Sequence, residues 1–146
     1  MPADLSQLIN GVRGLLPAAL DGALVGLKGA AAGVTFEMRQ TVAHGDQTGA
    51  TRANYTAYAV GRGADGSQEL GRAVAAVEAL NPGHSETGSV TINGELGVVV
   101  TSATDYQDKL ETENAGQKAV LGPTIAASGE RFTRAAASGS KRVLGG

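Results

Sequence analysis

The chain has no cysteine and no tryptophan, and its 146 residues include only two phenylalanines and three tyrosines. Without cysteine it can form neither disulfides nor thiolate metal sites. Its apolar content of 42% is ordinary, so alanine and valine supply much of what larger side chains usually supply. Small side chains bury little area each, at roughly 25 cal/mol per Å². We therefore expect modest stability for a monomer, supplemented by contacts with other subunits.

A basic excess is also missing, because 12 Lys and Arg stand against 14 Asp and Glu, for a net charge of −2. This argues against binding nucleic acid by phosphate neutralisation. His44 and His84 lie far apart in the sequence, so no metal ligand set and no cofactor is expected. The N-terminus has no basic signal-peptide segment, and no apolar run approaches the roughly 20 residues that span a membrane. These absences predict a single domain made in the cytoplasm.

Glycine is abundant, and the first long segment combines it with regularly spaced larger residues. Leucine, isoleucine and valine recur at helical spacing over residues 4–31, with Asp4 as a suitable N-cap. Pro17 predicts a kink near residues 13–17. Residues 33–42 fit either a strand or a continuation of this helix, and we favour the helix. Since the helix carries few charges, it is buried either in its own core or partly against a neighbour.

A second long helix is predicted from Gly122–Pro123 to residue 144, since proline suits the first helical position. One side of it is built mostly from small residues, which lets another backbone come close. The other side is basic. The small-residue side comprises Ile125, Gly129, Phe132, Ala136, Gly139 and Val143, and the basic side Arg131, Arg134, Lys141 and Arg142.

The middle of the chain predicts a small antiparallel sheet. Residues 54–60 alternate and are rich in β-formers. Asn93–Gly94 stands between two apolar runs, which is the signature of a type I′ hairpin. The second run, residues 96–100, is apolar on both faces and needs a further neighbour, for which residues 54–60 are the obvious candidate. The predicted fold class is therefore α+β, with long terminal helices packed on a mainly antiparallel sheet of at least three strands.

Residues 61–87 carry one predicted helix. Asp65, with Gln68 three residues later, resembles a capping box, and Asn81-Pro82-Gly83 ends the helix. The residues before it, Gly61 to Gly66, match G-x-G-x-x-G between a strand and a helix, which is the context of a dinucleotide-binding loop. An antiparallel hairpin follows instead of a parallel strand, so we prefer a plain glycine turn. A small nucleotide-binding enzyme remains the alternative from another class.

The segment 105–113 is acidic and lacks the regular oxygen spacing of a calcium loop. Its sign is opposite to that of the basic side of the last helix. Two pairings remain open: the segment meets the basic side of the next subunit in a head-to-tail ring, or the two elements meet within one chain.

Three segments, taken in order, resemble the neck and tail-completion family of long-tailed bacteriophages. They are Asp46-Gln47-Thr48-Gly49-Ala50-Thr51-Arg52, Tyr106-Gln107-Asp108-Lys109-Leu110-Glu111-Thr112 and Ala119-Val120-Leu121-Gly122-Pro123-Thr124-Ile125. The flanking helices fit the same plan, so residues 1–146 read as one head–tail connector domain. Relative to that plan, residues 61–87 look like an insertion that carries one helix.

The resemblance implies a non-enzymatic virion protein at the head–tail junction, assembled as a ring for which six subunits is a guess. Its partners would be the adjacent connector or stopper and the tail terminator or tail tube, with DNA only as passing cargo. A tail terminator ring is the close alternative. The interface residues implied are Asp46, Thr48, Gly49, Tyr106, Asp108, Leu110, Glu111, Glu113, Leu121, Pro123, Arg131 and Arg134.

Overall fold

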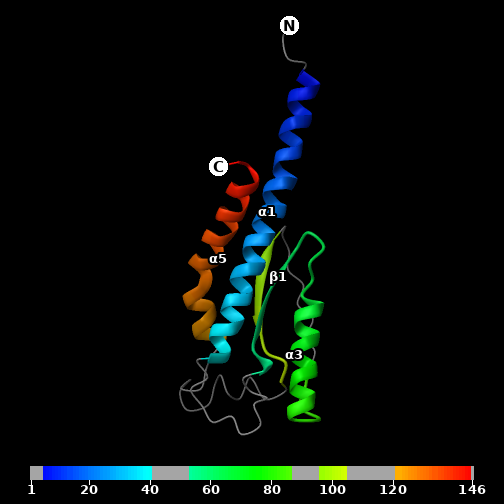
Figure 1. Cartoon of the computed structure of the whole chain (residues 1–146), viewed down its shortest axis with the longest axis vertical. Coiled ribbons are helices and arrows are strands. Elements are labelled where there is room, and N and C mark those ends of the chain that lie inside the picture. Colours follow the sequence, from blue (N-terminus) through cyan, green and yellow to red (C-terminus); the bar gives the residue numbers. More distant parts are fainter. Residues whose placement is uncertain (1–4, 41–52, 87–95, 105–120, 146) are drawn as a thin grey trace.

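The computed structural model describes residues 5–40, 53–86, 96–104 and 121–145, with the side chains of the first segment described from residue 15 onward. It is a layered mixture of helices and strands, as predicted, with α1 and α5 on one face of a small sheet and α3 on the other (Figure 1). The elements in chain order are α1 (Leu5–Gln40), β1 (Thr56–Val60), α3 (Ser67–Leu80), β2 (Gly97–Thr101) and α5 (Leu121–Val143).

Helix α1 is a single element of 36 residues that continues through Pro17. Its continuation beyond residue 33 is confirmed as far as Gln40. At about 1.5 Å per residue the helix is about 54 Å long. Its buried side chains recur at intervals of one, three or four residues, which places them on the side that meets the sheet: Ala23, Leu24, Leu27, Ala31, Val34 and Met38.

One stretch of α1 is long enough, and apolar enough by composition, to cross a membrane. The sequence analysis had expected no such stretch, because no uninterrupted apolar run reaches that length. The stretch is Leu15–Gln40, with a mean hydropathy of 1.3. Alanines, valines and leucines raise the average even though charges interrupt every apolar run. Core helices can have the same length and composition, and here Glu37 forms an ion pair with α5, while Asp21 forms one with the turn after β1.

β1 and β2 pair antiparallel, from Thr56 opposite Thr101 to Val60 opposite Gly97, which confirms that these two segments are neighbours. Within the described residues the sheet has two strands, so the prediction of at least three is not borne out. The expected third strand and the Asn93–Gly94 turn lie outside the described residues. On the other edge of the sheet, side chains of α1 occupy the place of a further strand.

Helix α3 begins at Ser67 after Gly66, so the predicted N-cap at Asp65 is one residue too early. Asp65 nevertheless accepts a hydrogen bond from the backbone N–H of Ser67, at 2.9 Å. The helix ends at Leu80, before Asn81, as predicted. Its buried residues Ala73 and Val77 pack with Ala103, which attaches α3 to the second face of the sheet.

α5 lies against α1 in the opposite direction, and the two backbones come into contact at glycines (Figure 1). A Cβ atom on Gly139 would collide with the backbone of Gly22, and one on Gly26 would collide with the carbonyl of Ala135. The hydroxyl of Ser140 donates to the carbonyl of Ala19 at 2.7 Å. Only glycine permits this approach, so the small-residue side of α5 packs within its own chain.

The predicted small-residue side of α5 is only partly correct. Gly139 is buried, and Phe132 and Ala136 are half-buried, but Ile125, Gly129 and Val143 are exposed. The helix also begins at Leu121, so the proline is its third residue instead of its first. The reason is that α5 inclines across α1, and the buried line on its surface passes through Ser128 and Gly139.

We predict that Gly139→Ala destabilises the protein by about 1–3 kcal/mol, because the added methyl group forces α1 and α5 apart. Gly129→Ala is the matched control in the same helix, since a Cβ atom there meets nothing within 4 Å. It should leave stability unchanged or raise it by up to about 1 kcal/mol. Urea unfolding followed by circular dichroism measures both. Equal effects of the two substitutions would show that the glycine contact is unimportant.

Candidate functional site

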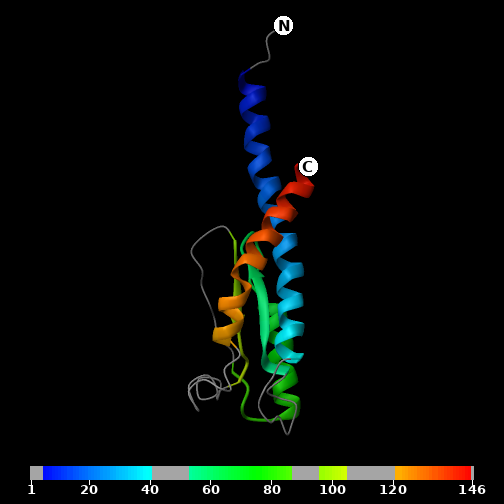
Figure 2. The same cartoon turned by 90° about the vertical axis from the view of Figure 1, so that its left-hand side faces the viewer.

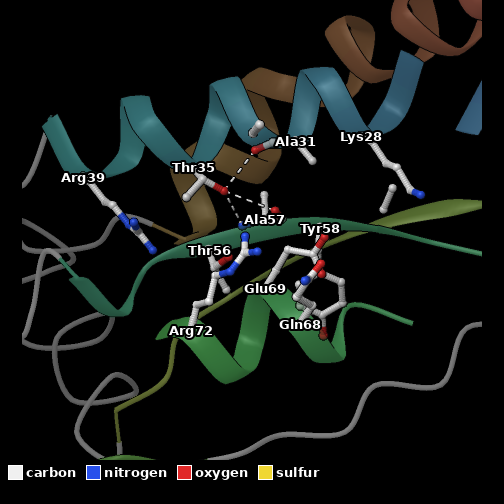
Figure 3. Close-up of a pocket in the computed structure, with 12 residues that line it drawn as sticks. Lys28, Ala31, Thr35, Arg39, Thr56, Ala57, Tyr58, Gln68, Glu69 and Arg72 are labelled. Carbon is white, nitrogen blue, oxygen red and sulfur yellow. Dashed lines mark hydrogen bonds between the residues drawn. The ribbon is translucent and has the colours of Figure 1, made fainter. Parts of the chain in front are cut away.

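A groove of about 440 Å³ runs along the edge of β1 that does not pair with β2, between α1 and α3 (Figure 3). Thr35 and Arg39 of α1 reach into it from one side, and Glu69 and Arg72 of α3 from the other. The chemistry of the groove depends on how its polar groups are already used.

Thr35 and Arg39 satisfy the backbone of β1 along this open edge. The hydroxyl oxygen of Thr35 accepts a hydrogen bond from the N–H of Ala57 at 2.8 Å, and lies 3.0 Å from the carbonyl oxygen of Ala31. Arg39 donates from Nε to the carbonyl of Tyr55 at 2.9 Å and from Nη2 to the carbonyl of Ala53 at 3.2 Å. These contacts protect the edge against pairing with a foreign strand.

The pKa values of two groups that line the groove, Arg39 and Tyr58, are shifted in directions that suit a structural role. Burial lowers the pKa of Arg39, but a guanidinium begins so far above neutrality that it stays charged. Burial raises the pKa of Tyr58, and the carboxylates of Glu69 and Asp65 raise it further. Its hydroxyl is therefore protonated at neutral pH. Within the described ranges, no three His, Asp or Glu side chains gather where they could hold a metal ion.

The glycine loop after β1 closes on itself. Gly61 and Ala64 exchange two backbone hydrogen bonds, of 2.8 and 2.9 Å. Arg62 and Gly63 between them have φ angles of 54° and 89°, as a tight hairpin turn requires. Gly66 rests against the ring of Tyr58, where a Cβ atom would collide with it. The residues that match G-x-G-x-x-G therefore build a turn.

The start of α3 is also poorly suited to a pyrophosphate. Asp65 places its carboxylate on the N–H of Ser67, and this hydrogen bond lowers the pKa of Asp65. An anionic ligand would meet a negative charge where a phosphate-binding helix offers free N–H groups. β1 also pairs with an antiparallel neighbour, whereas a dinucleotide-binding unit needs a parallel one.

The basic side of α5 contacts α1 of the same chain. Nη1 of Arg131 lies 2.6 Å from Oε2 of Glu37, and the guanidinium passes over Gly33. Arg134 is exposed, and its nearest carboxylate, on Glu130, is 4.0 Å away. Arg131 thus has an intrachain carboxylate partner that the sequence analysis did not identify.

The other predicted interface residues divide into two groups. Leu121 is half-buried and packs on the core cluster that contains Met38 and Tyr55, whereas Pro123 is exposed. Pro123 and Arg134 are both exposed on α5 and lie eleven residues apart, close to one face of the helix at about 100° per residue. The remaining predicted residues lie outside the described part of the chain: Asp46, Thr48, Gly49, Tyr106, Asp108, Leu110, Glu111 and Glu113.

Two features of the structure were missed in the sequence. Asn54 is buried and donates to the hydroxyl of Thr104 at 3.3 Å, which joins the start of β1 to the end of the β2 segment. Val25 and Phe36 are about two-thirds exposed although both lie in an apolar helix. A helical wheel over residues 15–40 would have found this second feature, because both residues fall opposite the buried side.

Comparisons with protein-family models, with curated protein sequences and with solved structures find no match to this chain.

We predict that Thr35→Val costs about 1–3 kcal/mol of stability, because it leaves the partly buried N–H of Ala57 without a partner. It should also speed hydrogen exchange at the Ala57 amide. Thr133→Val is the matched control: Thr133 also donates to the carbonyl four residues earlier in its helix, but it is exposed and has no contact with a strand. The control should change stability by less than about 0.5 kcal/mol. An unchanged exchange rate at Ala57 in Thr35→Val would contradict the proposed edge protection.

Proposed function

We propose that the chain is a structural subunit of the head–tail connector of a long-tailed bacteriophage, where copies of it form a ring through which DNA passes. The observation that carries this proposal is the length of α1. In both views its N-terminal part extends beyond every other described element (Figures 1 and 2). The contacts of α5 nearest that end are with Ala19 and Gly22.

The extended part of α1 needs a partner to be stable. Residues 5–18 form a segment roughly 20 Å long at about 1.5 Å per residue. An isolated helix of this length is marginal in water, and most helices in proteins are stabilised by packing of an apolar side. Nothing described in this chain supplies that packing, so an assembly of several chains is the environment that the element suits.

The order of the elements supports the connector assignment. A long first helix, a small antiparallel sheet and a last helix packed on the first agree with the plan that the family resemblance implies. A net charge near neutrality also suits a conduit, since a lining that neutralised many phosphates would hold DNA tightly. The adjacent connector or stopper, and the tail terminator or tube, would be its neighbours in the particle.

We predict that the purified chain forms a closed oligomer in native mass spectrometry, seen as a ring with a central channel by electron microscopy. Mass spectrometry of purified virions should find the chain, and antibody labelling should place it at the head–tail junction. Presence in isolated heads but not in isolated tails would support the neck position, and the reverse would support the terminator. A monomer that is absent from the particle would exclude both.

A further inference from the structure

Two apolar surfaces of α1 are left without partners. The first, here called the overhang stripe, includes Leu15 and Leu16, which are 54% and 64% exposed. The second, here called the outer face, includes Val25 and Phe36, which are 66% and 65% exposed. These four residues are among the exposed large apolar side chains of the described residues, and all four belong to α1.

The overhang stripe continues a side of α1 that is buried farther along the helix. In the sequence, Leu5, Leu8, Ile9 and Val12 precede Leu15 and Leu16 at intervals of one, three or four residues. At about 100° per residue these positions gather on one side of the helix. Toward the C-terminus of α1 the same side meets the sheet and α5 (Figure 1). The sheet and α5 both end before they reach the stripe. The stripe therefore lies on a side of α1 that is buried farther along the helix, but Leu15 and Leu16 themselves remain exposed.

The outer face carries small residues between two large ones. Between Val25 and Phe36 it carries Gly29, where an added Cβ atom would meet nothing within 4 Å, and Ala32, which is exposed. Small residues allow another helix to approach closely, and large residues on either side of them provide apolar area.

The two surfaces point in different directions. On the helical wheel their centres lie roughly 130° apart, at about 100° per residue. One neighbouring helix cannot cover both, so a pairwise exchange between two copies is excluded and each chain must contact two neighbours. We propose that the overhang stripe of one copy packs on the outer face of α1 in the next copy. A head-to-tail contact of this kind closes into a ring or continues as a filament.

A second copy suits these surfaces better than a membrane does. The overhang is roughly 20 Å long, whereas the hydrocarbon core is about 30 Å thick. The outer face lies where α1 is fixed to the rest of the domain by the ion pairs Glu37–Arg131 and Asp21–Arg62. A bilayer could not reach that face without meeting these charges.

Each contact is weak by itself. A helix about 10 Å across and 20 Å long buries on the order of 350 Å² on one side. This is about half the roughly 800 Å² per partner of a stable interface. Assembly should therefore depend on concentration, and closure of a ring should stabilise it because every chain then makes two contacts.

The test uses Leu16→Asp, which damages the stripe, and Phe36→Asp, which damages the outer face. At a concentration where the parent chain is assembled, light scattering after size-exclusion chromatography should show each variant alone as a monomer. Mixed in equal amounts and at increasing concentration, they should approach heterodimers and nothing larger, because only one intact pair of surfaces remains and a single contact is weak. Leu80→Asp is the control: Leu80 is 44% exposed at the end of α3, away from both surfaces. It should assemble like the parent chain.

Circular dichroism must show that the variants remain folded, which is expected since the replaced side chains are exposed. The proposal is overturned if the parent chain is monomeric at every concentration tested, if either variant assembles like the parent chain, or if the mixture forms no heterodimer even at the highest concentration. A monomeric parent chain that floats with phosphatidylcholine–phosphatidylglycerol vesicles would show that a membrane covers these surfaces instead. The inference does not depend on the proposed virion role. Head-to-tail assembly by a protein absent from virions would defeat that role alone. A ring in virions that both variants still form would defeat this inference alone.

Discussion

The approach of α1 to α5 at Gly22, Gly26 and Gly139 is the constraint on which the rest of the structure depends. Because no side chains separate the two backbones there, α5 is fixed in position along α1. That position brings Arg131 to Glu37 and places Phe132 over the sheet. It also determines where α5 ends, and therefore how much of α1 remains beyond the domain. A close contact made by small residues thus defines both the core and the surface that the core leaves uncovered.

A sheet of two described strands is stable here because helices cover its faces and one edge. Two strands alone are marginal in water. α1 and α5 bury one face, α3 buries the other, and Thr35 and Arg39 hydrogen-bond the backbone at the open edge of β1. The groove is therefore explained by protection of a strand edge. This arrangement also shows how a chain with few aromatic residues obtains a core: many small, close contacts replace a few large ones.

Packing through small residues also bears on function. A domain that packs through glycine and alanine has room on its surface for the leucines, valines and phenylalanine of α1 that it does not bury. Large exposed apolar areas are rare on monomers, so these side chains support the proposed assembly. The glycine loop and the groove, which first suggest ligand sites, are both occupied by contacts that hold the fold. Assembly is accordingly the role that the unoccupied surfaces support.

The sequence by itself determined the helices, the pairing of β1 with β2, and the stop at Asn81, because these follow from local spacing and turn residues. It could not show that Arg131 meets Glu37, that Thr35 protects β1, or that Phe36 faces outward. Each of these depends on which elements lie side by side and in what rotation, and spacing along one chain does not encode the identity of a distant partner. Tertiary structure alone decided which apolar residues of α1 are core and which remain for a neighbour.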